Sequence, residues 1–392
     1  MATRLPVSAY ESRLETVRQH LDDAGADAAV WFDATSIDYL TGFNHIQTER
    51  PVCLVVTKGS IRISVPRLEV DRVATNERIE QVYHYFDYPG GKPMETVSTM
   101  LADLGVESVL ADMDGAPGVM GYEGPSLSEV VEVETQEWVK RMRWEKSPAE
   151  VALIRESARW ANLGHRYLAD YTVAGAHPAT VSQRATLDAS RVMLDTLGDR
   201  FVTRVRGGGP VSAGYISGAE TALPHGHTPN ERLQAGDVLI TGATANVDGY
   251  FAELERTMFV GPPSDEQRHY FELMVEAQSI AIEALGPGVE IAEVDRAVWS
   301  FFEAEGVEDL AQHHVGHNIG MDGHEPPYID RGWTDHCEDE DDTVMQPGQV
   351  YTIEPGLYTE EAGYRHSDTV AITEDGTEVL TYFPRSLEAN SI

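Results

Sequence analysis

Histidines and carboxylates gather in the second half of this 392-residue chain, in short stretches bounded by glycine or proline. His225 lies in SGAETALPHGHT, and His317 and His324 lie in QHHVGHNIGMDGHEPP. Glu354 lies in YTIEPGLY, and Arg365 lies in GYRHSDTV. Loops held by a rigid sheet are where catalytic groups tend to sit. Because imidazoles transfer protons near neutral pH, these stretches predict a chemically active site.

A further pair of acids lies in the stretch 236–261, GDVLITGATANVDGYFAELERTMFVG, which has the layout of a β-hairpin. Residues 246–249, Asn-Val-Asp-Gly, supply the turn, because glycine tolerates a positive φ there. Glu253 and Glu255 are two residues apart on the second strand, so both project from one face. Two such carboxylates could hold a metal, grip a cationic substrate group or pair with arginines.

The active residues must be positioned by helices and strands. The predicted helices and strands fall into two parts of the chain, with a boundary near residue 140. The first part alternates helices and strands. Its predicted helices are 9–24 and 93–104, and its predicted strands are 27–32, 52–57, 61–65 and 107–113. We therefore predict an N-terminal domain over 1–140.

The second predicted domain, 141–392, begins with a helix at 148, because Ser147 and Glu150 form a capping-box pattern around Pro148. This part reads as α+β, with helices and a largely antiparallel sheet. Its predicted helices are 148–171, 177–198, 264–285 and 290–305, and its predicted strands are 201–206, 237–242, 249–260, 349–354 and 367–373.

The chain is strongly acidic, with 65 Asp and Glu against 29 Lys and Arg and a net charge of −36. The acid is spread along the whole chain, as in proteins of the haloarchaeal type that are adapted to high salt, where screening removes self-repulsion. A polyanionic surface argues against nucleic acid as a partner. Without a run of about 18 apolar residues or a signal-peptide core, we expect a cytoplasmic protein that has no membrane partner.

The ordered motifs LPHG, GD…DGY…RT, GHNIG…HE, TIEPGLY and GYRHSD resemble the Xaa-Pro peptidase/creatinase family. RWEKSPAEVALIRES resembles the interdomain helix of that family, and the stretch from YESRL to ERPVCLVV resembles its N-terminal domain. The resemblance implies a creatinase-type α/β domain followed by a pita-bread catalytic domain with a pseudo-twofold curved antiparallel sheet. It also implies a homodimer in which the N-terminal domain reaches toward the partner's active site.

Peptidases of this family hold two divalent metals with Asp, Asp, His, Glu and Glu, and the resemblance carries these ligands onto five positions. Three of them keep a ligand type, namely Glu253, His317 and Glu354. Gly242 and Ser367 occupy the other two. From this pattern we predict that the site has no metal cofactor, with one divalent metal such as Mn²⁺ on Glu253, His317 and Glu354 as the fallback.

These departures are similar to creatinase, the metal-free branch of the fold, whose substrate-binding glutamate matches Glu255. We therefore expect metal-independent hydrolysis of a non-peptide C–N bond in a small cationic or zwitterionic substrate. A histidine would act as general base, and Glu255 and Glu354 would hold an amidine or guanidinium group. The predicted catalytic residues are His225, His317 and Glu354, and the predicted substrate-binding residues are Glu255, His324 and Arg365.

Other interpretations are open. The main alternative is a metal-dependent Xaa-Pro dipeptidase or aminopeptidase, and a second is an inactive homologue that binds a partner. The substrate could be creatine, or a cyclic amidine as in ectoine hydrolase. Glu253 could face away from the site and pair with Arg256 or Arg365, and Asp368 could pair with Arg365. Structural roles are expected for His227, His313 and His314.

Overall fold

A computed structural model describes residues 2–204, 209–337 and 339–392, and these form two compact units. The N-terminal unit comprises largely residues 6–142, and the larger unit comprises largely residues 143–392. The sequence predicts domains at 1–140 and 141–392, meaning segments that fold independently. That division stays a prediction.

The N-terminal unit is built on a six-stranded mixed sheet with strand order β4-β3-β2-β1-β5-β6. Helix α4 packs onto it, and Met94, Val97 and Leu101 of this helix share a buried core with strand residues. The strands are β1 (Ala28–Trp31), β2 (Cys53–Thr57), β3 (Ile61–Pro66), β4 (Gln81–Tyr85), β5 (Ser108–Ala111) and β6 (Glu132–Thr135). The helices are α1 (Val7–Ala24), α2 (Ala34–Thr41), α3 (Val70–Val73), α4 (Pro93–Leu104) and α5 (Trp138–Met142).

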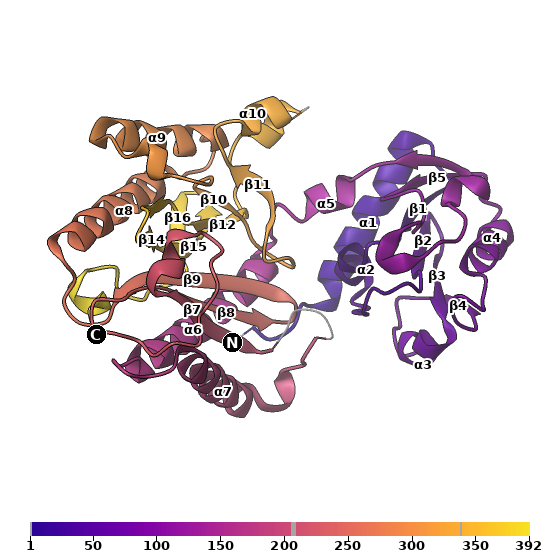
Figure 1. The fold of residues 1–392 in the computed structure, drawn as a ribbon. Coiled ribbons are helices and arrows are strands. Elements are labelled where there is room, and N and C mark those ends of the chain that lie inside the picture. Colours follow the sequence, from indigo (N-terminus) through magenta and orange to yellow (C-terminus); the bar gives the residue numbers. More distant parts are fainter. Residues whose placement is uncertain (1, 205–208, 338) are drawn as a thin grey trace. The chain divides into compact units, whose positions relative to one another are not determined.

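The larger unit contains a curved antiparallel sheet with strand order β11-β10-β12-β15-β9-β8-β7, and β16 pairs with β15 (Figure 1). Strands β13 (Gly356–Tyr358) and β14 (Gly363–Arg365) form a separate pair. The main-sheet strands are β7 (Val211–Ser217), β8 (Val238–Val247), β9 (Tyr250–Phe259), β10 (Gly316–Asn318), β11 (Glu325–Ile329), β12 (Val350–Ile353), β15 (Ser367–Thr373) and β16 (Gly376–Val379). The helices are α6 (Pro148–Tyr171), α7 (Pro178–Leu197), α8 (Asp265–Ala284), α9 (Ile291–Glu305) and α10 (Trp333–His336).

Two helix pairs cover this sheet, and they lie beside different strands (Figure 1). Helix α6 begins with the capping box of Ser147 and Glu150, and its residue Ile154 packs in one core with Tyr250 of β9. Helix α8 contributes Met274 to a second core that includes Ile353 of β12. Burial of these apolar faces leaves the opposite face of the central strands available for polar side chains.

The β8–β9 hairpin turns at Asp248 and Gly249, whose φ angles are 53° and 91°. Positive φ at both central residues gives the turn twist that suits paired strands, and aspartate followed by glycine favours it. The pairing is regular over its whole length, with Gly242 opposite Glu255. The sequence therefore fixes which side chains of β8 and β9 share a face.

One predicted strand is wrong where it can be tested. Phe201–Arg204 have no regular secondary structure, and the rest of the predicted strand 201–206 lies outside the described residues. Strand β7 instead forms from Val211 to Ser217, where alternate residues are buried. Serine and glycine occupy three of the seven positions of β7, so its alternation is weak in the sequence.

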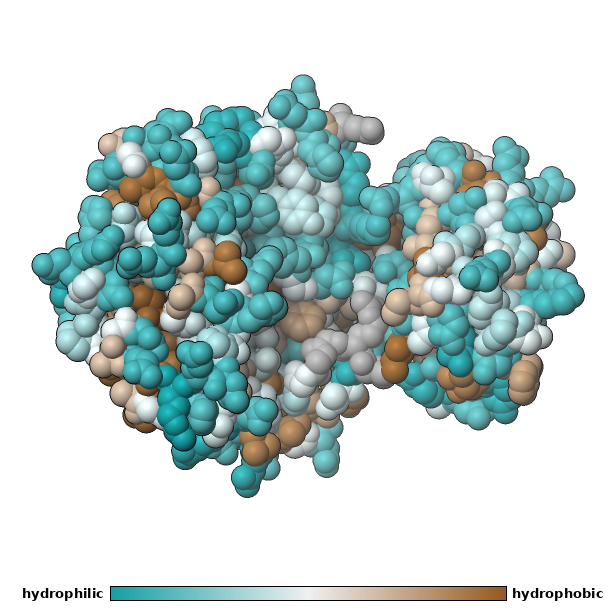
Figure 2. All heavy atoms as spheres, viewed as in Figure 1, coloured by the Kyte–Doolittle hydropathy of each residue, from teal (hydrophilic) through white to brown (hydrophobic). Residues whose placement is uncertain are grey.

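Figure 2 shows hydrophilic residues over most of the visible face of each unit, as the acidic composition requires. Among the described residues, none of the helices combines the length and apolar character needed to cross a membrane.

Candidate active site

Glu253 and Glu255 project from one face of β9, which we call the front face of the sheet. Gly242 of β8 and Ser367 of β15 lie directly opposite Glu255 on the two neighbouring strands. A Cβ atom on Gly242 would lie 3.5 Å from Oε1 of Glu255, so the glutamate carboxylate lies beside the glycine. The front face therefore carries a row of Gly242, Glu255 and Ser367 with one acid at its centre.

Arg365 neutralises that acid. Its Nε and Nη2 donate to the two carboxylate oxygens of Glu255 at 2.6 and 3.0 Å, and its Nη1 donates to Pro224 O and to Tyr358 Oη. Burial opposes the charge on the guanidinium, but Glu255 outweighs burial and the pKa of Arg365 is raised well above its usual value. The predicted pair of Arg365 with Asp368 is wrong, and Glu255 is not open to a cationic substrate group.

Glu253 also faces the site. Ser367 Oγ donates to its Oε1 at 2.9 Å, and burial together with the nearby Glu354 and Glu255 raises the pKa of Glu253. The expectation that Glu253 turns away to pair with Arg256 is wrong, because residues three apart on a strand lie on opposite faces. Glu253 is thus part of the cluster.

His317 of β10 and Glu354, which follows β12, meet at the centre of the site. His317 is fully buried, and its Nε2 lies 3.2 Å from Oε1 of Glu354. The ring Nδ1 lies 3.0 Å from Asn318 O and donates to it, so Nε2 of the neutral ring is an acceptor. Among the described residues this Nε2 has no hydrogen-bond partner of acceptable geometry. Two acceptors therefore face each other and need a proton or a cation between them.

Electrostatics agree with this geometry. Burial alone would lower the pKa of His317, but the Glu354 and Glu253 carboxylates outweigh burial and raise it. Burial alone would raise the pKa of Glu354, but His317 and Arg365 outweigh burial and hold it well below its usual range. The pair is therefore a strong attractor of positive charge.

His324 lies against His317, with ring centroids 3.4 Å apart and an angle of 22° between the planes. Partial burial and the neighbouring His317 lower the pKa of His324 to about 4, so its ring is neutral near pH 7. The next residue, Glu325, is buried and accepts from Lys146 at 2.8 Å and from Arg143 at 2.9 Å. These ion pairs fix the start of β11 and with it the place of His324.

His225 lies exposed in the loop before β8, close enough to His324 to contribute to its lowered pKa. The adjacent Pro224 carbonyl accepts from Arg365 at 3.1 Å, which ties this loop to the site. His313 instead makes a hydrogen bond with Tyr358 Oη at 2.8 Å and belongs to the support of Arg365. The predicted residues His225, His317, His324, Glu255, Glu354 and Arg365 thus come together, although their roles remain predictions.

Tyr358 carries no signal of its own in the sequence, and Ser367 is notable there only as a position without a metal ligand. Tyr358 links His313 to Arg365, and Ser367 binds Glu253. The glycines of β13 and β14 are the available clue to the position of Tyr358. A Cβ on Gly363 would lie 2.6 Å from the Tyr358 ring, so only glycine fits there.

Within the part of the chain that the structure describes, two sets of donors could hold a metal ion, and both contain Glu354. One set is His317, His324 and Glu354, and the other is Glu253, Glu255 and Glu354, with the ligand atoms of each set within 4.8 Å of one another. Imidazole nitrogen and carboxylate oxygen suit divalent ions such as Mn²⁺, Co²⁺ and Zn²⁺. The unpartnered Nε2 of His317 is aimed at this cluster, so the residues present fit a divalent cation.

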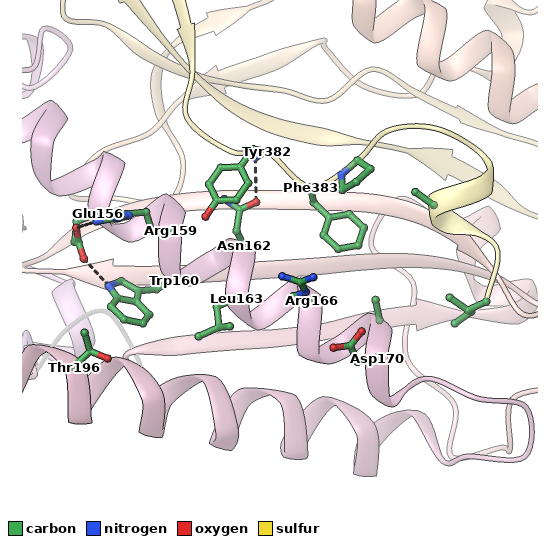
Figure 3. Close-up of a pocket in the computed structure, with 14 residues that line it drawn as sticks. Glu156, Arg159, Trp160, Asn162, Leu163, Arg166, Asp170, Thr196, Tyr382 and Phe383 are labelled. Atoms are coloured by element: carbon green, nitrogen blue, oxygen red, sulfur yellow. Dashed lines mark hydrogen bonds and ion pairs between the residues drawn. The ribbon is translucent and has the colours of Figure 1, made fainter.

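A separate cavity of about 870 Å³ lies between α6 and the segment 382–392 (Figure 3). Trp160, Leu163 and Arg166 line it from the helix, and Tyr382 and Phe383 line it from the segment. None of the cluster residues lines this cavity.

A curved antiparallel sheet with a buried histidine and carboxylate cluster on one face defines a hydrolase of the pita-bread class. Residues 152–374 match Metallopeptidase family M24, and residues 13–143 match the Creatinase/Prolidase N-terminal domain. The chain belongs to metallopeptidase family M24. The family and the fold class expected from the sequence are thereby confirmed.

Relatives in sequence agree with this assignment, and a solved structure agrees with the fold. An Xaa-Pro dipeptidase of Pyrococcus furiosus is 37% identical over 172 residues, or 44% of this chain and 47% of that protein. An Xaa-Pro dipeptidase of Lactobacillus helveticus is 25% identical over 96% of this chain and 98% of its own length. The Xaa-Pro dipeptidase structure from Bacillus anthracis is similar with a TM-score of 0.80 and 22% identity, covering 98% of this chain and 100% of its own.

Two sequence-based expectations are therefore corrected. Metal-independent hydrolysis of a non-peptide bond is overturned by relatives named as peptidases, and the expected absence of a cofactor is overturned by the metallopeptidase family and by the two donor sets. The physical reason lies in Glu255 and Glu354. Their carboxylates were expected to bind a substrate cation, but Glu255 binds Arg365 and Glu354 faces a ring nitrogen.

Proposed function

We propose that this protein is a metal-dependent hydrolase of small peptides, of the Xaa-Pro dipeptidase type. The observation that carries the proposal is the contact of His317 Nε2 with Glu354 Oε1 at 3.2 Å, inside a cluster of further donors. His317 Nδ1 donates to the Asn318 carbonyl, so Nε2 of the neutral ring and the Glu354 oxygen are both acceptors. A histidine held in this way by a backbone carbonyl is typical of metal ligands. The names of the similar dipeptidases support the choice of substrate.

The residues that would hold the cation are His317, His324 and Glu354. A divalent cation, when bound there, supplies Lewis acidity that polarises the scissile carbonyl and acidifies water. We assign the transfer of a proton to the leaving nitrogen to His225, which lies on the exposed loop before β8. Arg365 fixes the Pro224 carbonyl and so positions the loop that bears His225.

The test is an assay of the purified full chain in concentrated KCl, with an Xaa-Pro dipeptide and the matching Xaa-Ala dipeptide. We expect cleavage of the Xaa-Pro substrate after loading with Mn²⁺ or Co²⁺, loss of cleavage with EDTA, and recovery when metal is restored. Cleavage that EDTA leaves unchanged would contradict metal dependence. Failure to cleave either dipeptide in any metal would contradict peptidase activity.

A matched pair of variants tests the role of the loop histidine. His225 and His227 are both exposed and lie two residues apart, and the backbone N–H of His227 donates to the Glu220 carboxylate at 3.0 Å. We expect His225→Ala to lower kcat by about 10²–10⁴-fold, the usual contribution of a general acid or base. His227→Ala should leave kcat unchanged. Equal effects of the two substitutions would exclude the assigned role.

We infer the cellular environment of the protein from its amino-acid composition. A net charge of −36 supports a protein adapted to a salt-rich cytoplasm, since ions at molar concentration screen charges beyond about 3 Å. Unfolding by denaturant at increasing KCl should then show stability that rises with salt. The homodimer implied by the family resemblance is a proposal that sedimentation equilibrium tests.

A further inference from the structure

Arg365 places a fixed positive charge inside the acidic cluster. Its side chain is 9% exposed, and four of its five N–H donors are used, two on Glu255, one on Pro224 O and one on Tyr358 Oη. Its Nε also lies 3.9 Å from Oε2 of Glu354. An arginine stays charged at any physiological pH, so this cation is always present.

The pair with Glu255 removes one ligand from one of the two donor sets. Both oxygens of Glu255 accept from Arg365, at 2.6 and 3.0 Å, in the bidentate arrangement that is the strongest of the charge-assisted hydrogen bonds. Of the set of Glu253, Glu255 and Glu354, only Glu253 and Glu354 then remain as ligands, and Glu354 also belongs to the other set. The set of His317, His324 and Glu354 keeps all of its ligands.

The residues beside Glu255 on the neighbouring strands also argue against a second metal ion. On its two flanking strands stand Gly242 and Ser367, and neither carries a carboxylate. The Ser367 hydroxyl is already used as a donor to Glu253. No group in this row supplies a further ligand beside Arg365.

We propose that this chain binds one divalent cation, on His317, His324 and Glu354, and that the Arg365 guanidinium takes the place of a second cation beside Glu255. The proposal rests on the metal dependence proposed above and adds the stoichiometry and the ligand set. It makes Arg365 a positioning residue and Glu255 its counter-ion.

Metal content tests this directly. The full chain is equilibrated with Mn²⁺ in concentrated KCl, freed from excess by gel filtration, and examined by elemental analysis and by electron paramagnetic resonance. We expect one Mn²⁺ per chain with the spectrum of an isolated ion. Two ions with an exchange-coupled spectrum would overturn this inference and leave the metallopeptidase function standing. Absence of bound metal would overturn the proposed function, and the inference with it.

Variants of the Arg365–Glu255 pair test whether Arg365 takes the place of a second metal cation. Arg365→Met leaves Glu255 without its cation, so we expect the Mn²⁺ content to rise from one to two ions per chain. The matched control is Arg155→Met, which removes an exposed arginine from its pair with Glu378 and should leave one ion. If the folded Arg365→Met variant still binds a single Mn²⁺ ion, the proposal that Arg365 takes the place of a second cation is overturned.

Because Arg365→Met leaves a buried charge unpaired and could unfold, a double variant completes the test. Arg365→Met with Glu255→Gln removes both charges together, and we expect one Mn²⁺ bound with unchanged affinity. His324→Asn should lower Mn²⁺ affinity by at least about tenfold. Loss of Mn²⁺ from the double variant, or unchanged affinity in His324→Asn, would show that the cation lies on the Glu255 side and would overturn the ligand set.

Discussion

On β9, Glu253 and Glu255 project from the front face of the sheet, and Arg256 projects from the back face. Each face holds a buried arginine–carboxylate pair. On the front, Arg365 binds Glu255, with side chains 9% and 17% exposed. On the back, Arg256 binds Asp368, with side chains 1% and 2% exposed.

The Arg256–Asp368 pair on the back and the His317–Glu354 contact on the front differ in how completely their polar atoms are satisfied. Arg256 also donates to the carbonyls of Phe383 and Ser367, and Asp368 also accepts from Thr381 and Gln278. On the front, by contrast, an acceptor nitrogen faces a carboxylate without a donor between them. A satisfied network stabilises the fold, whereas an unsatisfied one in a native protein marks a place where a ligand belongs.

The back face should therefore have the largest effect on stability. Arg256→Met leaves Asp368 buried without its cation, and we expect the free energy of unfolding to fall by about 3–5 kcal/mol. Denaturant unfolding in concentrated KCl measures it. Arg155→Met, which breaks an exposed pair, should cost less than about 1 kcal/mol. Similar losses in the two variants would contradict the distinction between the back face and the surface.

The front face should affect the ligand more than the fold. Glu354→Gln keeps the shape of the side chain but removes its charge from His317, and we expect Mn²⁺ affinity to fall by about 100-fold. The free energy of unfolding without metal should fall less than in Arg256→Met, because His317 and Arg365 stabilise the charge of Glu354 in the folded state but Arg365 keeps its bidentate pair with Glu255. Isothermal titration and denaturant unfolding separate the two effects. A large loss of stability with unchanged affinity would make Glu354 a structural residue.

A pH dependence should come from the back face. His165 is fully buried, and its Nε2 lies 2.7 Å from Thr241 Oγ1, whose own hydrogen binds Arg256 O. Burial, together with the nearby Arg256, lowers the pKa of His165 to about 3. The folded state thus binds fewer protons than the unfolded state below about pH 6.5, so stability is complete above that pH and falls as pH decreases toward 3.

The expected size is about 1.4 kcal/mol at one pH unit below the unfolded pKa. His165→Gln keeps a donor for Thr241 and cannot be protonated. The loss of unfolding free energy between pH 7.5 and 5.5 should therefore be smaller in this variant than in the parent, by about 1.4 kcal/mol. Equal slopes in the two proteins would show that His165 titrates in the same way folded and unfolded.

The sequence predicts the part of this comparison that is local. Alternation along a strand places Glu253 and Glu255 on one face, and the Asp248-Gly249 turn fixes the β8–β9 register. The histidines and Glu354 could be singled out because they end elements at glycine or proline. These features depend on neighbours within about ten residues.

The partners across the sheet could not be predicted. Glu255 and Arg365 are 110 residues apart, and their contact depends on the pairing of β9 with β15 and on the course of β14. The spacing of three between Arg365 and Asp368 is compatible with opposite faces, but it does not show which charged partner each side chain meets. That missing register is why Glu255 was expected to bind a substrate cation rather than Arg365.

The smallest expected effect compares two hydroxyls that donate to carboxylates. Thr381 donates to Asp368 on the back face at 2.7 Å, and Ser367 donates to Glu253 on the front at 2.9 Å. Thr381→Val leaves a buried charge with one donor fewer and should cost about 1.5 kcal/mol. Ser367→Ala should cost about 0.5 kcal/mol, because the half-buried Glu253 can accept from water instead. Denaturant unfolding of the two variants measures the difference, and a larger cost for Ser367→Ala would mean that the front face stabilises the fold as the back face does.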